Sequence, residues 1–195
     1  FFLITEPFMI FIQKKWKEER NHSLQSLEFP FSYREGQRKM VSSVYHAIGA
    51  SRQIFIQAPT GVGKTMSTIF PAVRAVGEGK GETIFYLTAK TITRTVAQEA
   101  FEVLREKGMK YKVVTITAKE KLCFMDETKC DPVHCPYARG HFDRVNDAVY
   151  ELWTTKSRYD RETIREQAEK WQVCPFEMCL DLSVWVDAVI CDYNY

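Results

Sequence analysis

Apolar and polar residues alternate along this chain in a way that predicts strands separated by helices. Four apolar runs have the length of strands, and they fall at residues 53–57, 83–87, 111–116 and 184–191. Helical patterns precede, separate or follow them, at residues 5–20, 35–48, 64–76 and 92–107. Strands that alternate with helices form a parallel sheet with right-handed crossovers, so the pattern predicts an α/β fold.

The alternation stops between residues 118 and 180. This stretch is predicted to be a separate, mostly helical insertion. Two apolar stripes with helical spacing predict core packing within it. The first is Phe142, Val145, Val149 and Leu152, and the second is Ile164, Ala168 and Trp171. We therefore expect three units: an upstream helix and linker at 1–27, an α/β domain from 28–118 with 181–195, and the insertion at 119–180.

The composition is that of a globular protein. The chain has 195 residues, 45% of them hydrophobic and 27% charged, with a formal net charge of +2. That charge neither requires nor excludes a nucleic-acid partner. No apolar run approaches the roughly 20 residues of a membrane span, so no membrane partner is expected. The chain begins at Phe1 rather than Met and stops at Tyr195 just after an apolar strand, so we expect a piece of a longer protein.

A glycine-containing loop follows the first strand. It reads Ala58, Pro59, Thr60, Gly61, Val62, Gly63, Lys64 and Thr65. The glycines let main-chain N–H groups face an anion, and the helix that opens at Lys64 favours phosphate at its N-terminus. In such loops the lysine reaches the β- and γ-phosphates and the threonine hydroxyl holds Mg²⁺. Ala58 stands where the full motif has glycine, which is tolerable because the last four residues form most of the phosphate site.

Six cysteines are present, and five of them fall within residues 123–179. Their spacing lacks the paired C-x2-C of most zinc sites, whereas four thiolates are the usual complement of a 4Fe–4S cluster. The candidate ligands are Cys123, Cys130, Cys135 and Cys174. Zinc and unliganded thiols are the alternative interpretations. Cys179 competes with Cys174 as the fourth ligand, and Cys191 is expected to be a buried strand residue.

The loop and the cysteine-bearing insertion, in this order, resemble the iron–sulfur superfamily-2 DNA helicases of the XPD/DinG type. The resemblance covers roughly residues 30–195. It is carried by the segments Tyr33 to Gln37, Ala58 to Thr65, Phe85 to Thr91, Lys121 to Cys123, Cys135 to Tyr137 and Cys174 to Phe176. It implies a RecA-like first motor domain with a 4Fe–4S insertion, using ATP and Mg²⁺.

The resemblance also implies roles for single residues. Gln37 would read the adenine of ATP through its amide, with Arg34 supporting that pocket. Lys64 and Thr65 would act on the phosphates and Mg²⁺. Thr88, Lys90 and Thr91 would contact the backbone of single-stranded DNA. The four cysteines would hold the cluster.

One departure from the family pattern concerns hydrolysis. A superfamily-2 helicase needs an Asp-Glu pair after an apolar strand, and here Tyr193 follows Asp192. We therefore expect this chain alone to be inactive in hydrolysis. The full-length protein is expected to be a cytoplasmic, monomeric ATP-dependent helicase that moves 5′ to 3′ on single-stranded DNA and unwinds forked duplexes. The alternatives are a non-motor P-loop ATPase or kinase with a zinc-stapled insertion, and a metal-stapled DNA-binding module with a vestigial P-loop.

Overall fold

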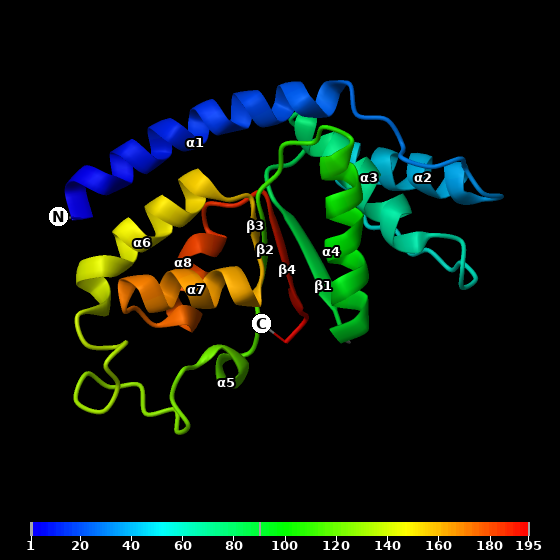
Figure 1. Cartoon of the computed structure of the whole chain (residues 1–195). Coiled ribbons are helices and arrows are strands. Elements are labelled where there is room, and N and C mark those ends of the chain that lie inside the picture. The colour runs from blue at the N-terminus through cyan, green and yellow to red at the C-terminus, as the bar shows by residue number, and fades with distance from the viewer. Residues whose placement is uncertain (1, 90, 195) are drawn as a thin grey trace.

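The structure is a computed structural model that describes residues 2–89 and 91–194. Three helices come first, helices and strands alternate from α3 to β2, and the second half is mainly helical (Figure 1). In chain order they are α1 (Phe2–Gln25), α2 (Gln37–Gly49), α3 (Lys64–Gly77), β1 (Ile84–Thr88), α4 (Thr91–Glu106), β2 (Val113–Thr115), α5 (Lys119–Leu122), α6 (His141–Thr155), β3 (Arg158–Tyr159), α7 (Arg161–Trp171), α8 (Pro175–Ser183) and β4 (Ala188–Asp192).

The strands form one parallel sheet in the order β1-β4-β2-β3. The C-terminal strand β4 therefore lies in the interior of the sheet, between β1 and β2. Its first four residues are buried, which explains why the sequence there is a continuous apolar run. The predicted parallel α/β fold is confirmed.

Helices cover both faces of the sheet, and each face has its own core (Figure 1). Alternate residues of β4 point to opposite faces, because Ala188 and Ile190 join the core with α3 and α4 while Val189 and Cys191 join the core with α6, α7 and α8. This sandwich places the P-loop helix α3 and the cysteine-bearing helices on opposite sides of one sheet.

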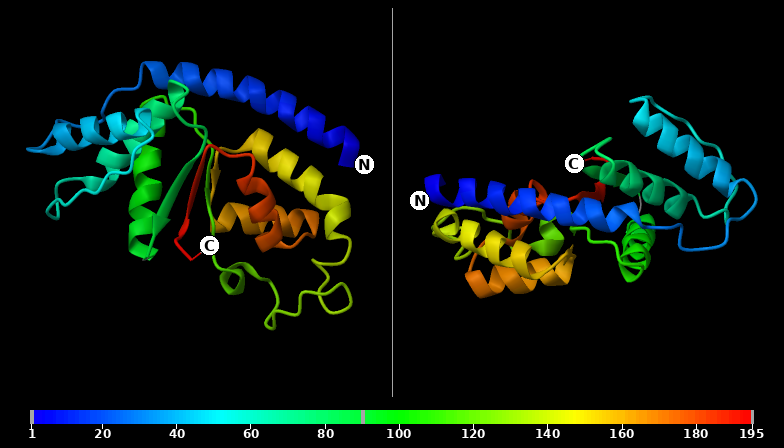
Figure 2. Two further views of the ribbon diagram at one scale, coloured as in Figure 1. Left: turned by 180° about the vertical axis from the view of Figure 1, so that it is seen from behind. Right: turned by 90° about the horizontal axis from the view of Figure 1, so that it is seen from above.

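Helix α1 crosses one end of the molecule, from α6 to α3 (Figure 2). It is fixed by the buried carboxylate of Asp187, which accepts hydrogen bonds from Trp16 Nε1 at 2.8 Å and Arg20 Nη1 at 2.7 Å. The main-chain N–H of Lys112 donates to the same carboxylate at 2.8 Å. None of the helices in the described part of the chain combines the length and apolarity that crossing a bilayer requires.

The predicted strand at 53–57 is wrong. These residues form neither strand nor helix, and Ile54, Phe55 and Ile56 are 41%, 93% and 37% exposed. A strand is stable only beside a neighbour that pairs with its main chain, and none of the four strands in the described residues pairs with this segment. The apolar residues of this segment are therefore left without a neighbouring strand among the described elements.

The cysteine-bearing stretch differs from its prediction in two details. Phe142 was expected in the core with Val145, Val149 and Leu152, yet it is 77% exposed while those three are buried. It lies in the first turn of α6, before the helix packs against its neighbours. The stretch also contributes β3, which pairs with β2 through Val113–Arg158 and Val114–Tyr159. The division into three units stays a prediction.

Candidate functional site

The loop before α3 has the backbone shape of an anion-binding turn. Gly61 and Gly63 have φ of +84° and +79°, a region that side chains other than glycine rarely adopt. Gly63 is the N-cap of α3, so the first N–H groups of that helix open toward the loop. A phosphate at this point would meet main-chain donors and the positive end of the helix.

Lys64 and Thr65 are the first two residues of α3. The ammonium of Lys64 donates to the main-chain oxygens of Ala58 at 3.1 Å and Pro59 at 2.8 Å, so it lies against the loop itself. Thr65 is half-buried beside it. Both residues therefore begin the helix that follows the loop, as the sequence predicts, and their roles toward phosphate and Mg²⁺ stay predictions.

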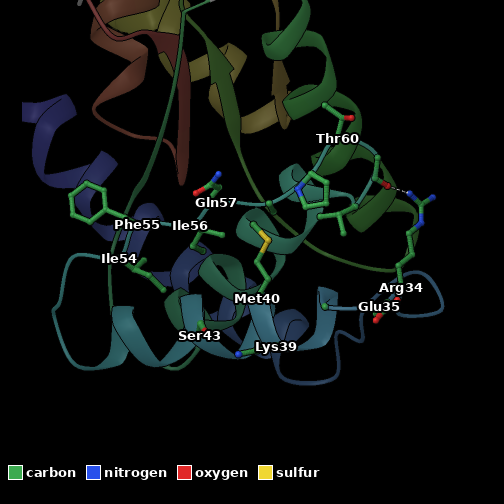
Figure 3. Close-up of a pocket in the computed structure, with 15 residues that line it drawn as sticks. Arg34, Glu35, Lys39, Met40, Ser43, Ile54, Phe55, Ile56, Gln57 and Thr60 are labelled. Carbon is green, nitrogen blue, oxygen red and sulfur yellow. Dashed lines mark hydrogen bonds between the residues drawn. The ribbon is translucent and has the colours of Figure 1, made fainter.

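The loop borders a pocket that has a volume of about 760 Å³ (Figure 3). This volume lies in the range of small-molecule sites. One wall is the segment from Ile54 to Val62, and the other is the start of α2 with the residues before it. Met40 points from α2 toward the loop, and Arg34 donates a hydrogen bond to the main-chain oxygen of Gly61 (Figure 3). Ala58, Pro59, Thr60, Gly61 and Val62 all line this pocket.

Gln37 lies between the loop and the residues before α2. It is 3% exposed, and its Oε1 accepts from the main-chain N–H of Arg34 at 3.0 Å. Its Nε2 is so close to Gly63 that a Cβ on that glycine would lie 2.6 Å away. Gln37 and Arg34 therefore both touch the phosphate loop, one at Gly63 and the other at Gly61. The sequence predicted this proximity only through the family resemblance.

The second predicted site lies at the carboxyl edge of the sheet. Thr88 ends β1 and is 5% exposed, and it stands opposite Asp192 of β4. Thr91 begins α4, its side chain is not described, and Lys90 lies outside the described residues. Arg94, one turn into α4, pairs with the carboxylate of Asp192 at 2.8 Å. Sequence reasoning missed Arg94, although its spacing of three residues from Thr91 places both in the first turn.

The four predicted cysteine ligands line one small cavity. Cys123, Cys130, Cys135 and Cys174 share it with Phe124, Tyr137 and Phe176. Cys179 and Cys191 lie elsewhere, buried in the core on the α6–α8 side of the sheet. All six cysteines are free thiols. The structure therefore brings together the set that spacing selected and separates the rival Cys179 from it.

The surroundings of this cavity bear on thiolate chemistry. Burial raises the pKa of the Cys174 thiol, and main-chain N–H groups at the start of α8 oppose that rise. A hydrogen bond to Cys130 raises the pKa of Lys119, so the ammonium is stabilised beside the thiols. The N–H of Met125 donates to Cys123 Sγ at 3.4 Å. The N–H donors and the ammonium favour the thiolate form that binds metal, whereas the burial of Cys174 opposes it.

The positions of these side chains are a separate matter. Across residues 2–89 and 91–194, no group of three or more His, Cys, Asp and Glu side chains is arranged to hold a metal ion. The four thiols share a cavity without converging on one point. The ligand set therefore stays a prediction.

Comparison with known proteins identifies the class. The model of the DEAD/DEAH box helicase family matches residues 34–137, more than half of the 195-residue chain. The chain belongs to this family, whose match spans the loop, the pocket beside α2 and three of the four cysteines.

A curated relative agrees with that class. A probable ATP-dependent helicase of Methanocaldococcus jannaschii is 24% identical over 169 residues, which cover 85% of this chain and 24% of the relative. The chain thus spans about a quarter of the length of the relative it matches.

Proposed function

We propose that this chain is the nucleotide-binding part of an ATP-dependent DNA helicase of the iron–sulfur type. The observation that carries the proposal is the loop at Gly61 and Gly63, whose left-handed backbone leads into α3 at Lys64. It is the arrangement expected for triphosphate binding, in a chain of the DEAD/DEAH box helicase family.

The nucleotide would bind between the loop and the residues before α2. Main-chain N–H groups from Thr60 to Thr65 would hold the phosphates, and Lys64 would leave the oxygens of Ala58 and Pro59 for the β- and γ-phosphates. Thr65 would hold Mg²⁺, which neutralises phosphate charge when bound. Gln37 and Arg34, already in contact with the loop, would couple recognition of the adenine to its backbone.

Single-stranded DNA would bind at the carboxyl edge of the sheet. Thr88, Lys90 and Thr91 would contact phosphates there, aided by the N-terminus of α4. In the full-length protein, ATP-driven motion would run 5′ to 3′ and would separate forked duplexes. We further propose that this protein works as a cytoplasmic monomer.

The cysteine cavity would hold a 4Fe–4S cluster. Cys123, Cys130, Cys135 and Cys174 would be its ligands, supported by their shared cavity and by the neighbouring Lys119. The cluster would brace the stretch from 119 to 180 rather than take part in hydrolysis. Iron and sulfide found in the purified protein would support this part of the proposal, and one bound zinc in a colourless protein would contradict it.

Replacement of Lys64 tests the nucleotide site. Lys64→Ala removes the only charge that the loop contributes, and we expect on the order of tenfold weaker binding of a fluorescent ATP analogue. Lys107→Ala, at an exposed position near the end of α4, is the matched control and should bind as the unmodified chain does. Equal affinities of all three proteins would reject the assignment of the loop.

A further inference from the structure

Cys174 is held in place by a buried histidine from another helix. Its main-chain N–H donates to Nδ1 of His141 at 3.2 Å, and His141 is 4% exposed at the start of α6. Because Nδ1 accepts, the ring proton is on Nε2. That Nε2 is buried with no hydrogen-bond partner in the described structure. An unpaired buried donor costs about 1–3 kcal/mol of stability, so packing alone does not explain a histidine at this position.

Cys123 is held in the same manner from α7. Nη1 of Arg165 donates to the main-chain oxygens of Leu122 at 2.7 Å and Cys123 at 3.1 Å. The guanidinium also lies over the ring of Phe124, 4.4 Å from its centroid. These contacts fix the position of the main chain at Cys123 and leave its sulfur free of them.

The two helices that carry these contacts form a rigid pair. Their facing residues Val145, Leu152, Ile164 and Ala168 are buried in one core. Glu151 of α6 accepts from Gln167 at 3.0 Å and from Trp171 Nε1 at 2.6 Å, both on α7. His141 and Arg165 are therefore fixed relative to one another.

In the described residues, no recorded hydrogen bond joins the main chain of the other two cysteines to α6 or α7, and the contact of Lys119 with Cys130 is made to the cysteine side chain. The main-chain N–H of Cys135 donates to Asp131 O at 2.9 Å, within the same loop. Asp131 in turn accepts from the N–H groups of Val133 and His134. Cys130 is exposed. The four thiols thus divide into a pair positioned by helices and a pair carried on a loop.

We propose that His141 and Arg165 are positioning residues that preform half of the metal site, at Cys174 and Cys123, onto which the loop with Cys130 and Cys135 closes. The inference rests on the proposed function, because it requires that these cysteines bind iron. It also accounts for four thiols that line one cavity without converging on one point, because the recorded bonds from α6 and α7 hold the main chain at Cys174 and Cys123.

The test measures how firmly the chain retains iron. The chain is reconstituted with iron and sulfide, and loss of its visible absorption to a chelator is timed. His141→Gln places an acceptor near Nε2 instead of Nδ1, whereas His141→Asn places one near Nδ1. We expect iron release on the order of tenfold faster for His141→Gln and near the unmodified rate for His141→Asn. Cys135→Ser provides the reference for full loss.

Arg165 is tested in parallel. Arg165→Leu should release iron faster by a similar factor, while Arg161→Leu, an exposed position on the same helix, should not. Binding of the ATP analogue should be unchanged in every variant, which checks that each has folded.

Two results would overturn the inference in distinguishable ways. If the unmodified chain takes up no iron, the cluster in the proposed function falls and this inference falls with it. If the unmodified chain holds iron but His141→Gln and Arg165→Leu release it at the unmodified rate, the positioning roles alone are wrong.

Discussion

Gly61 and Gly63 have the same left-handed backbone but different surroundings. A side chain at either position would cost roughly 1–2 kcal/mol of backbone strain. At Gly61 an added Cβ meets nothing within 4 Å, whereas at Gly63 it lies 2.6 Å from Gln37 Nε2. The loop is therefore sterically coupled to Gln37 at one glycine and independent of it at the other.

This difference predicts the outcome of two alanine substitutions. Gly63→Ala should lower the unfolding temperature and the affinity for the ATP analogue more than Gly61→Ala, because only the first displaces Gln37. Adding Gln37→Ala to Gly63→Ala should recover the extra loss of stability. Thermal unfolding of the three variants measures these changes. An equal fall in unfolding temperature for both glycine substitutions would show that Gln37 does not press on the loop.

At the level of elements, α1 is joined to the sheet by one carboxylate. Asp187 is 3% exposed, and its carboxylate accepts hydrogen bonds from Trp16, Arg20 and the main-chain N–H of Lys112. Arg20 is equally buried, so its charge depends on this partner. A buried ion pair adds little net stability by itself, but removing one partner leaves the other charge buried and uncompensated.

Asp187→Ala should therefore destabilise the fold strongly. We expect a loss of about 3–5 kcal/mol in the free energy of unfolding, because the guanidinium of Arg20 remains buried without its counter-charge. Asp147→Ala, exposed on α6, should change stability by less than about 0.5 kcal/mol. Denaturant unfolding compares them, and a similar small effect for both would mean that α1 is not anchored at Asp187.

The elements also show what the sequence could and could not predict. Helices α3 and α4 and strands β1, β2 and β4 overlap the ranges that apolar periodicity predicts, because each contributes residues to one of the two cores. The segment 53–57 has the same pattern without a partner strand. Strand β3 has only two residues, too few for any pattern. The contact of His141 with the main chain of Cys174 could not be predicted, since sequence spacing does not reveal a bond between α6 and the start of α8.

At the scale of the whole molecule, binding and hydrolysis of nucleotide should be separable. The loop would supply phosphate ligands under the proposed function, yet in this sequence no Asp-Glu pair follows an apolar strand to orient water and Mg²⁺. The carboxylate of Asp192, the nearest candidate by position, is paired with Arg94.

We therefore predict that the chain binds ATP but releases no measurable phosphate, with or without single-stranded DNA. A phosphate-release assay over the concentration range that saturates binding checks this. DNA-stimulated release that Lys64→Ala abolishes would contradict it and would require another residue to orient the attacking water.

The pairing of β3 with β2 bears on how such chains diversify. The cysteine-bearing stretch gives the sheet its fourth strand, and the main-chain oxygens of Trp153 and Lys156 accept from the buried ammonium of Lys112, next to β2. Exchange of residues 119–180 for a foreign sequence would remove the edge strand β3. It would also leave the buried ammonium of Lys112 without its two main-chain acceptors. Residues 119–180 therefore cannot be exchanged as an independent unit, and changes in their sequence must remain compatible with the sheet that they complete.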